Sequence, residues 1–238
     1  MNVCVVSGFV QLPSHPRKVE EYQALGAKLM KALNEVGADN IFAFPAYEEC
    51  WLAKFLTSRE KAGYPLPMHS RGDNPQKNTM PFHVVQHQKT EWLANAAQLE
   101  KDTDTFVWMD YGIMHQPGVT AAVIQEFLPK IVKDDFAIPG CWDQYYRTIQ
   151  AVNWRFCGSL IIVPRQFCHD FDVAVKMVTK ERIRTTGHVT WEVNDWARVE
   201  HSTPLPIRWY KGDHNEQQFT GYNPADAVVS NSRKVRHR

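Results

Sequence analysis

The sequence predicts an α/β sandwich with a central, mostly parallel sheet flanked by helices. Short apolar, β-branched runs alternate along the chain with stretches of helical periodicity, which is typical of such sandwiches. The hydrophobic fraction of 44% and the charged fraction of 22% are those of an ordinary globular chain. We see no internal repeat and no low-complexity linker in the 238 residues, so we expect one domain.

The N-terminal segment predicts a strand followed by a helix. Residues 3–10 form a β-branched run broken by Ser7-Gly8, which is typical of a buried strand ending in a small-residue loop. Residues 18–37 then carry large apolar side chains at helical spacing: Tyr22, Leu25, Leu29, Met30 and Leu33. Gly37 is expected to close this helix as its C-cap.

The next segment contains the longest loop that we expect. Residues 41–45 predict a second strand, and residues 48–57 predict a short helix. Residues 63–78 are rich in Gly, Pro, Asn and Arg, and long loops in compact domains commonly carry function. Residues 82–85 are mostly apolar and indicate a strand, and residues 88–99 form an amphipathic helix.

The rest of the chain continues the alternation. Residues 106–109 predict a buried strand that ends abruptly at Asp110-Tyr111-Gly112. The remaining predicted elements are helices at 119–132, 166–180 and 190–200, and strands or extended segments at 136–138, 159–163 and 207–210.

Charge and cysteine content narrow the class of protein further. With 27 Lys and Arg against 26 Asp and Glu, the net charge of +1 indicates no acidic partner by bulk electrostatics. Five cysteines cannot all pair and none lies in a CxxC spacing, so we expect reduced thiols and no zinc site. No signal-like N-terminus and no apolar run near the ~20 residues of a membrane span is present, and we expect a cytoplasmic protein.

Asp110 is the first candidate functional residue. A buried strand delivers this carboxylate to its C-terminal end, where α/β sheets place their ligands. Gly112 permits a sharp turn or the close approach of a ligand. A carboxylate at this place can hold a hard cation that bridges diphosphate oxygens. The alternative is an aspartate that only caps a turn or the next helix.

Residues 86–113, QHQKTEWLANAAQLEKDTDTFVWMDYGI, resemble the central segment of the HtrL/YibB-like glycosyltransferases of the GT-A fold. In those proteins a helix with K-x-x-W/F leads into a strand ending VWxDxGI. The opening CVVSGFVQLP…EEY, the strand WRFCGSLIIVP and the helix TWEVNDWARVE match the family's order. The resemblance implies one GT-A-like, Rossmann-type domain over 1–238, with a nucleotide-binding half (1–113), a donor-sugar and acceptor half (114–231) and a basic tail (232–238).

The resemblance also implies an activity. GT-A enzymes move a sugar from a nucleotide-sugar donor, UDP-linked by family habit, to a hydroxyl of a saccharide or similar acceptor. This chain would then be a hexosyl- or pentosyltransferase. The family binds Mn²⁺ or Mg²⁺ through Asp-x-Asp, but here Asp110 fills the first position and Gly112 the third. His214 and Asp213 are the implied metal ligands that replace the second acid, and the alternative is a solvated loop histidine.

Three further residues are implied to bind the donor. Lys89, on the helix before the Asp110 strand, would contact the diphosphate as a point charge. Ser7 ends the first strand, where GT-A folds place the base and ribose. Gly158 would let the donor sugar approach the backbone. The alternatives are a solvated surface lysine for Lys89 and a turn hydroxyl for Ser7.

The segment around Glu192 is the second candidate for chemistry. Glu192 and Asp195 are three residues apart and share a helix face. GT-A enzymes place an acidic residue on an equivalent helix against the donor sugar or the acceptor hydroxyl, so the resemblance implies that a carboxylate here acts as base. Trp191 and Trp196 offer flat surfaces on which sugars stack. The alternative is an acidic first helical turn with both tryptophans in the core. Asp143, with Trp and Tyr neighbours, is a weaker acceptor-site candidate.

Two rival functions stay open at this level. The basic tail and the loop at His69-Ser70-Arg71 would suit a DNA-modifying glycosyltransferase that acts on hydroxylated bases. The incomplete Asp-x-Asp motif would suit a nucleotide-sugar-binding protein without turnover. Salt-sensitive DNA binding and a donor hydrolysis assay distinguish these from the first function.

Overall fold

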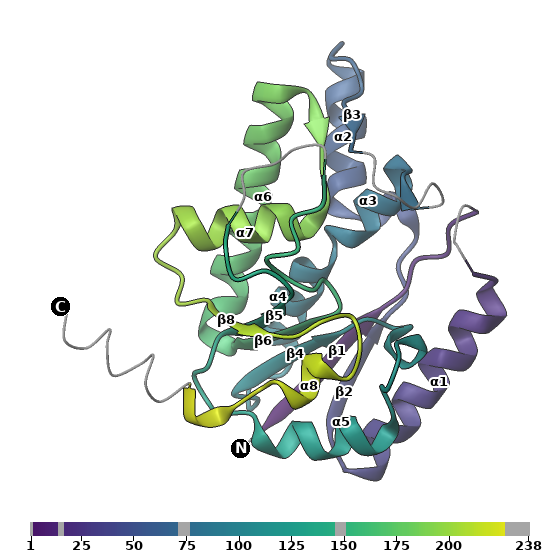
Figure 1. Cartoon of the computed structure of the whole chain (residues 1–238). Helices are drawn as coiled ribbons and strands as arrows, with labels where there is room; N and C mark the ends of the chain where they lie inside the picture. Colours follow the sequence, from purple (N-terminus) through teal and green to yellow (C-terminus); the bar gives the residue numbers. More distant parts are fainter. Residues whose placement is uncertain (1, 14–16, 71–76, 146–150, 227–238) are drawn as a thin grey trace.

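A six-stranded sheet forms the centre of the molecule in the computed structural model, which describes residues 2–13, 17–70, 77–145 and 151–226 (Figure 1). The strand order is β2-β1-β4-β6-β5-β8. Strand β6 runs antiparallel to both of its neighbours, whereas the pairs β1–β2, β1–β4 and β5–β8 are parallel. This arrangement confirms the predicted fold class. The strands are β1 (Val3–Gly8), β2 (Asp39–Ala43), β4 (Thr105–Met109), β5 (Ala137–Gly140), β6 (Leu160–Pro164) and β8 (Arg208–Lys211).

Helices cover both faces of this sheet (Figure 1). On one face, α1, α5 and α8 pack over an apolar cluster that includes Leu29, Val107 and Phe127. On the other face, α2, α3, α4, α6 and α7 pack over a larger cluster that includes Leu93 and Phe171. The helices are α1 (Val19–Glu35), α2 (Trp51–Lys61), α3 (Met80–Gln86), α4 (Lys89–Leu99), α5 (Ala121–Phe127), α6 (Arg165–Thr186), α7 (Glu192–Ser202) and α8 (Gln217–Thr220).

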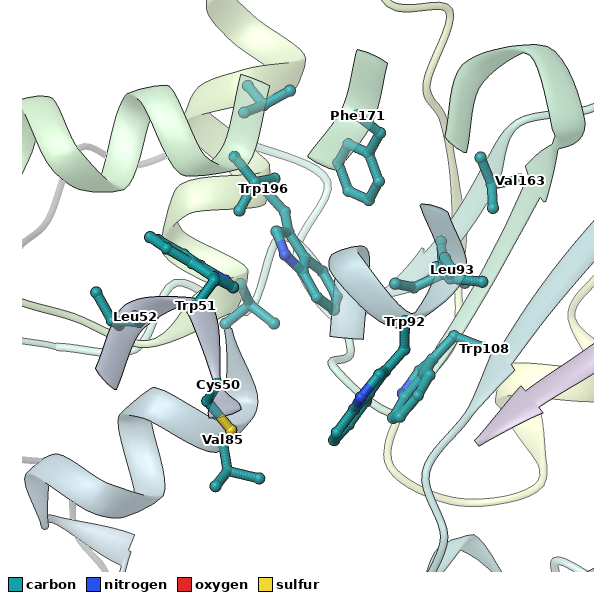
Figure 2. Close-up of a cluster of buried hydrophobic side chains, with 14 of the residues drawn as sticks. Cys50, Trp51, Leu52, Val85, Trp92, Leu93, Trp108, Val163, Phe171 and Trp196 are labelled. Carbon is teal, nitrogen blue, oxygen red and sulfur yellow. The ribbon is translucent and has the colours of Figure 1, made fainter. Parts of the chain in front are cut away.

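Strand β4 is buried on both sides because helices cover both faces. Its side chains alternate, so Val107 and Met109 join the cluster under α1 while Phe106 and Trp108 join the one under α4. Trp108 stacks on Trp92 of α4, with ring centroids 5.4 Å apart and an interplanar angle of 14° (Figure 2). Trp108 lies two residues before Asp110, and the alternation places its side chain where it can contact the Asp110 carboxylate.

The predicted strand at residues 82–85 is wrong, because these residues lie inside helix α3. Thr79 caps the helix by accepting a hydrogen bond from the backbone N–H of Phe82, and Pro81 stands in the first turn. Both features are helix-start signals. A short, mostly apolar segment is ambiguous between strand and buried helix, and here the cap favours the helix.

Other predicted elements are present with shifted ends. Residues 48–57 divide into a 3₁₀ turn (Tyr47–Glu49) and α2. The helix predicted at 119–132 is shorter, because Pro129 opens a 3₁₀ turn (Leu128–Lys130) after α5. Helix α6 runs to Thr186 and is closed by Gly187 in the left-handed region at φ 68°.

The described part of the predicted long loop contains β3 (Met68–His69), which pairs in parallel with β7 (His188–Val189). Residues 71–76 of that loop, Arg71 among them, and the basic tail 232–238 lie outside the described residues. None of the helices that the structure describes is long and apolar enough to cross a membrane.

Candidate functional site

A pocket of about 460 Å³ opens where the C-terminal ends of β1 and β4 meet the start of β6. Gly8 ends β1, Asp110 follows β4, and Ser159 precedes β6. Three cations and two carboxylates line the pocket, together with several aromatic rings. The charged lining residues are Arg17, Lys77, Lys89, Asp110 and Glu192. This is the edge of the sheet at which the sequence predicted a ligand site.

Asp110 is held at the pocket by its neighbours in β4 and β6. Its backbone N–H donates to the carbonyl of Ser159 (3.0 Å), which continues the β4–β6 ladder. Trp108 donates its indole N–H to Asp110 Oδ1 (2.8 Å). Gly8 matters to this arrangement, because a Cβ at that position would lie 2.7 Å from the Trp92 ring that supports Trp108. The carboxylate therefore has a defined orientation at the pocket floor, with its side chain 33% exposed.

Lys89 is a buried cation between two acids. Its ammonium donates to the carbonyl of Gly158 (2.8 Å), to Glu192 Oε1 (3.0 Å) and to Asp110 Oδ1 (3.1 Å). An ammonium has three N–H groups, and these three acceptors use them. The predicted alternative of a solvated surface lysine is wrong, since only 3% of Lys89 is exposed. Contact with a diphosphate would require Lys89 to give up one of its present acceptors.

Glu192 is the first residue of α7 and lines the pocket. Burial alone would raise its pKa, but the adjacent Lys89 ammonium holds the pKa of Glu192 below its ordinary value. Burial would likewise lower the pKa of Lys89, but Asp110 and Glu192 raise it. The charged forms of Lys89 and Glu192 thus stabilise each other. Glu192 Oε2 has no hydrogen-bond partner among the described residues.

Gly158 allows this cluster to pack against the backbone. A Cβ at this position would collide with Glu192 Oε1 and would lie 3.3 Å from Lys89 Nζ. The close approach expected at Gly158 therefore exists in the structure, where the protein's own side chains occupy it. Gly158 also lines the pocket.

Arg17 and Lys77 were not predicted from the sequence as pocket residues. Arg17 precedes α1 and Lys77 precedes α3, so no local pattern links them. Burial is the main cause that lowers the pKa of Lys77, and the charges of Arg17 and Lys89 act in the same direction. The position of Lys77 in the segment 63–78, predicted as a functional loop, was the available signal.

Aromatic rings form two groups around the pocket. Phe9, Tyr22 and Tyr111 lie together beside the end of β1, with centroid distances of 5.1 Å for Phe9–Tyr22 and 5.4 Å for Phe9–Tyr111. Trp154 and Trp191 line another part of the wall. Trp196, also expected as a sugar-stacking surface, is instead fully buried in the core, so that part of the prediction is wrong.

The other predicted site residues lie outside the pocket lining. Asp195 is fully buried and contacts His87 (3.1 Å), Thr179 (2.7 Å) and Arg182. Asp143 is exposed, and its backbone carbonyl accepts from Arg155. The hydroxyl of Ser7 is buried with no hydrogen-bond partner among the described residues. These positions give none of the three side chains direct access to a ligand in the pocket.

His214 lines the pocket, as does Asp110. Its ring packs edge-to-face against Trp154, with centroids 4.7 Å apart. Its Nδ1 lies 3.9 Å from the sulfur of Cys141, 3.9 Å from the sulfur of Cys157 and 3.4 Å from Asp213 Oδ1. The thiol of Cys141 has its pKa lowered to about 6, chiefly through its hydrogen bond with Cys157, and His214 acts in the same direction.

Comparison with known proteins leaves the activity open. No family model matches the chain, and no curated protein matches it. Among solved structures, the chain is similar to the crystal structure of a glycosyltransferase involved in the glycosylation of the major capsid of PBCV-1. The alignment has 11% identity and a TM-score of 0.48, and covers 98% of this chain and 100% of that one. At these values the match supports no inference about activity, and membership of the HtrL/YibB-like family stays a prediction.

Proposed function

We propose that this protein is a glycosyltransferase that binds a nucleotide-sugar donor in the pocket and transfers the sugar to a hydroxyl of a saccharide or similar acceptor. The observation that carries the proposal is the buried Lys89, bonded to both Glu192 and Asp110 at the floor of the pocket. Further cations and aromatic rings surround this cluster. The donor is UDP-linked in this proposal because of the sequence resemblance alone.

The diphosphate of the donor is assigned to Arg17 and Lys77. Both line the pocket, and Lys89 is already engaged with two carboxylates. Arginine offers a planar fork of donors and lysine a point charge, and each is a common phosphate partner. A pocket of about 460 Å³ lies within the range that small ligands and cofactors occupy.

The two aromatic groups suit the two ends of such a donor. Phe9, Tyr22 and Tyr111 lie at the end of β1, where a nucleotide base can pack on their faces. Trp154 and Trp191 offer flat apolar surface for a sugar ring at the part of the wall near His214 and Glu192.

Glu192 is assigned to the reacting sugars. In the transfer, the bond from the anomeric carbon to the diphosphate oxygen breaks and its electron pair stays on the leaving diphosphate. The acceptor hydroxyl oxygen forms the new bond to the anomeric carbon, and its proton passes to solvent. A carboxylate with a lowered pKa is a weak proton acceptor, because a good general base has a pKa near the working pH. We therefore assign Glu192 to accepting a sugar hydroxyl and to stabilising positive charge at the anomeric carbon.

The pocket also fits a hard cation at Asp110. Trp108 and Lys89 both contact Oδ1, and Oδ2 accepts no hydrogen bond among the described residues. One protein carboxylate with substrate phosphates is a common Mg²⁺ arrangement. Mn²⁺ or Mg²⁺ bound there would neutralise charge on the leaving diphosphate. Asp110 would hold it, whereas His214 Nδ1 lies next to the sulfurs of Cys141 and Cys157.

The rival functions have less support. Arg71 and the basic tail lie outside the described residues, and within the described part Ser70 packs against β7 through its backbone N–H. No described feature favours DNA as the acceptor. A nucleotide-sugar-binding protein without turnover would share the same pocket, so only a transfer assay separates it from the enzyme.

The test measures donor binding by the parent protein and then compares the turnover of two variants. A panel of nucleotide sugars, with and without Mn²⁺, is screened for a rise in melting temperature, since a ligand that binds only the folded state stabilises it. Asp110→Asn is then expected to lower the rate of sugar transfer or donor hydrolysis at least about 100-fold, the size of losing one electrostatic group.

Asp104→Asn is the matched control. Asp104 lies at the opposite end of β4 and pairs with the exposed Lys133 at 2.9 Å. We expect its activity to equal that of the parent protein. Equal activity of Asp110→Asn would refute the assignment of the site, and donor binding without measurable transfer by the parent protein would favour the binding protein.

A further inference from the structure

Four side chains that could bind a metal converge at one edge of the sheet, beside the pocket and outside its acid cluster. Cys141 follows β5, Cys157 lies three residues before β6, and Asp213 and His214 follow β8. The ends of β5, β6 and β8 meet here because β6 runs antiparallel between β4 and β5 while β8 is parallel to β5. Three separate segments thus supply the ligand atoms.

The ligand atoms of Cys141, Cys157 and His214 all lie within 4.8 Å of one another, a spacing close to that of three corners of a tetrahedral zinc site, and Asp213 lies beside two of them. The Sγ atoms of Cys141 and Cys157 are 3.8 Å apart, and each lies 3.9 Å from His214 Nδ1. Asp213 Oδ1 lies 3.3 Å from the sulfur of Cys141 and 3.4 Å from His214 Nδ1. Zinc bonds of about 2.3 Å to sulfur and about 2.1 Å to nitrogen or oxygen place tetrahedral ligands roughly 3.3–3.8 Å apart.

The chemistry of the donors selects among metals. Two sulfur ligands with one imidazole favour Zn²⁺ or another soft or borderline metal over Mg²⁺ or Ca²⁺, which prefer oxygen. Cys157 is buried and Cys141 is half-buried, so the sulfurs are largely shielded from solvent. Trp154 packs on the His214 ring and restricts its orientation, as the surroundings of a metal-bound histidine commonly do.

We propose that Cys141, Cys157, His214 and Asp213 bind one Zn²⁺ ion as a structural site. Each thiol loses its proton to solvent as its sulfur binds the metal. The sequence has no CxxC pair, and for that reason we expected no zinc site. Cysteines that are distant in the sequence nevertheless lie together in the fold.

The zinc site would stabilise the part of the pocket wall formed by Gly158 and His214. Cys157 directly precedes Gly158, whose carbonyl accepts from Lys89, and His214 itself lines the pocket. A metal at this place joins the loops after β5 and β8 to the segment before β6. The proposal does not depend on glycosyl transfer, because zinc would join the same three segments around any ligand.

Metal content and cobalt spectroscopy on the full chain test the proposal. Protein purified without chelator is expected to contain one zinc per chain by mass spectrometry of its metals. After removal of zinc, Co²⁺ is expected to produce thiolate-to-cobalt charge transfer and the strong visible bands of a tetrahedral site. Added Zn²⁺ should abolish both.

Variants locate the site. The double variant Cys141→Ser, Cys157→Ser should lose both the zinc and the cobalt spectrum, whereas Cys168→Ala, a buried cysteine on α6, should retain them. Asp213→Asn changes a mostly exposed side chain and should fold normally. We expect it to weaken zinc affinity at least about tenfold, because losing a ligand costs at least as much as losing a group that only orients one.

Other outcomes overturn the proposal. Parent protein that neither contains zinc nor produces the cobalt spectrum, or that loses two hydrogens in mass as a Cys141–Cys157 disulfide forms in its place, would exclude the site. Equal zinc affinity of the parent protein and Asp213→Asn would remove Asp213 from it. None of these measurements uses a nucleotide sugar, so their failure is distinct from failure of the proposed function.

Discussion

Two acids of the same helix, Glu192 and Asp195, have very different surroundings although they are three residues apart. At Glu192, the single ammonium of Lys89 pairs with two carboxylates, those of Glu192 and Asp110. At Asp195, two basic side chains, Arg182 and His87, contact one carboxylate. The first cluster has an excess of acid and lines the pocket. The second has an excess of base and lies inside the protein.

The two clusters differ in access to the pocket, although each carboxylate keeps one oxygen without a hydrogen bond among the described residues. Glu192 Oε2 and Asp195 Oδ1 both lack a hydrogen-bond partner among the described residues. Glu192 is the first residue of α7, next to Trp191 of the pocket wall, whereas Asp195 lies about one turn deeper. One turn of helix therefore separates an acid suited to substrate from an acid suited to stability, and this comparison can be tested.

The largest effect is expected for Asp195→Asn. This change leaves the Arg182 guanidinium buried without its carboxylate, and breaking a buried ion pair commonly costs about 3–5 kcal/mol. Chemical denaturation should show this loss in the free energy of unfolding. Asp143→Asn, at an exposed position, is the matched control and should change stability by less than about 0.5 kcal/mol. Equal stability of both variants would refute the structural role of Asp195.

The second largest effect is expected for Glu192→Gln and concerns the rate of sugar transfer. Glu192→Gln keeps the shape of the side chain and removes its charge, so kcat for sugar transfer should fall roughly 10²–10³-fold. Binding of the nucleoside diphosphate should barely change, because Arg17 and Lys77 are assigned to that group. Single-turnover rates and calorimetric affinities on the same preparation separate the two quantities.

Glu200→Gln, on the same helix and paired with Arg155 at 2.6 Å, is the control for Glu192→Gln. Its kcat should match that of the parent protein. A normal kcat for Glu192→Gln together with a lowered melting temperature would give Glu192 the same structural role as Asp195, and the comparison would fail.

The smallest effect concerns pH and the charge of Lys77. Burial lowers the pKa of Lys77, so its ammonium is present below that lowered pKa and is lost as the pH rises through it. Affinity for a nucleoside diphosphate should therefore fall as the pH rises, by at most about tenfold per pH unit for one proton. Calorimetric titrations across the alkaline range measure this slope.

Lys77→Arg should remove that pH dependence, because arginine keeps its charge at all of these pH values. The same substitution at the exposed Lys133 should leave the slope unchanged. A slope that persists in Lys77→Arg would assign the proton to another group.

The sequence by itself determined the features that depend on local pattern. Residues 106–109 were predictable as a buried strand because both of their faces are apolar, and Asp110 therefore had to lie at its end. Helix α4 and the helix carrying Glu192 and Asp195 were predictable from their periodicity. Pattern failed at residues 82–85, where a short apolar run has no distinct period and the Thr79 cap decided the structure.

Only the tertiary structure decided which side chains meet. Lys89 and Glu192 are 103 residues apart, and Cys157 and His214 are 57 apart, so no spacing rule joins either pair. The strand order brings them together, because the antiparallel β6 places Gly158 and Cys157 beside the ends of β4, β5 and β8. Once buried there, an ammonium requires carboxylates nearby, since an isolated charge in the interior is too costly to keep. Sequence pattern reports the local conformation of each segment, whereas the charge balance of a site depends on neighbours that only the fold supplies.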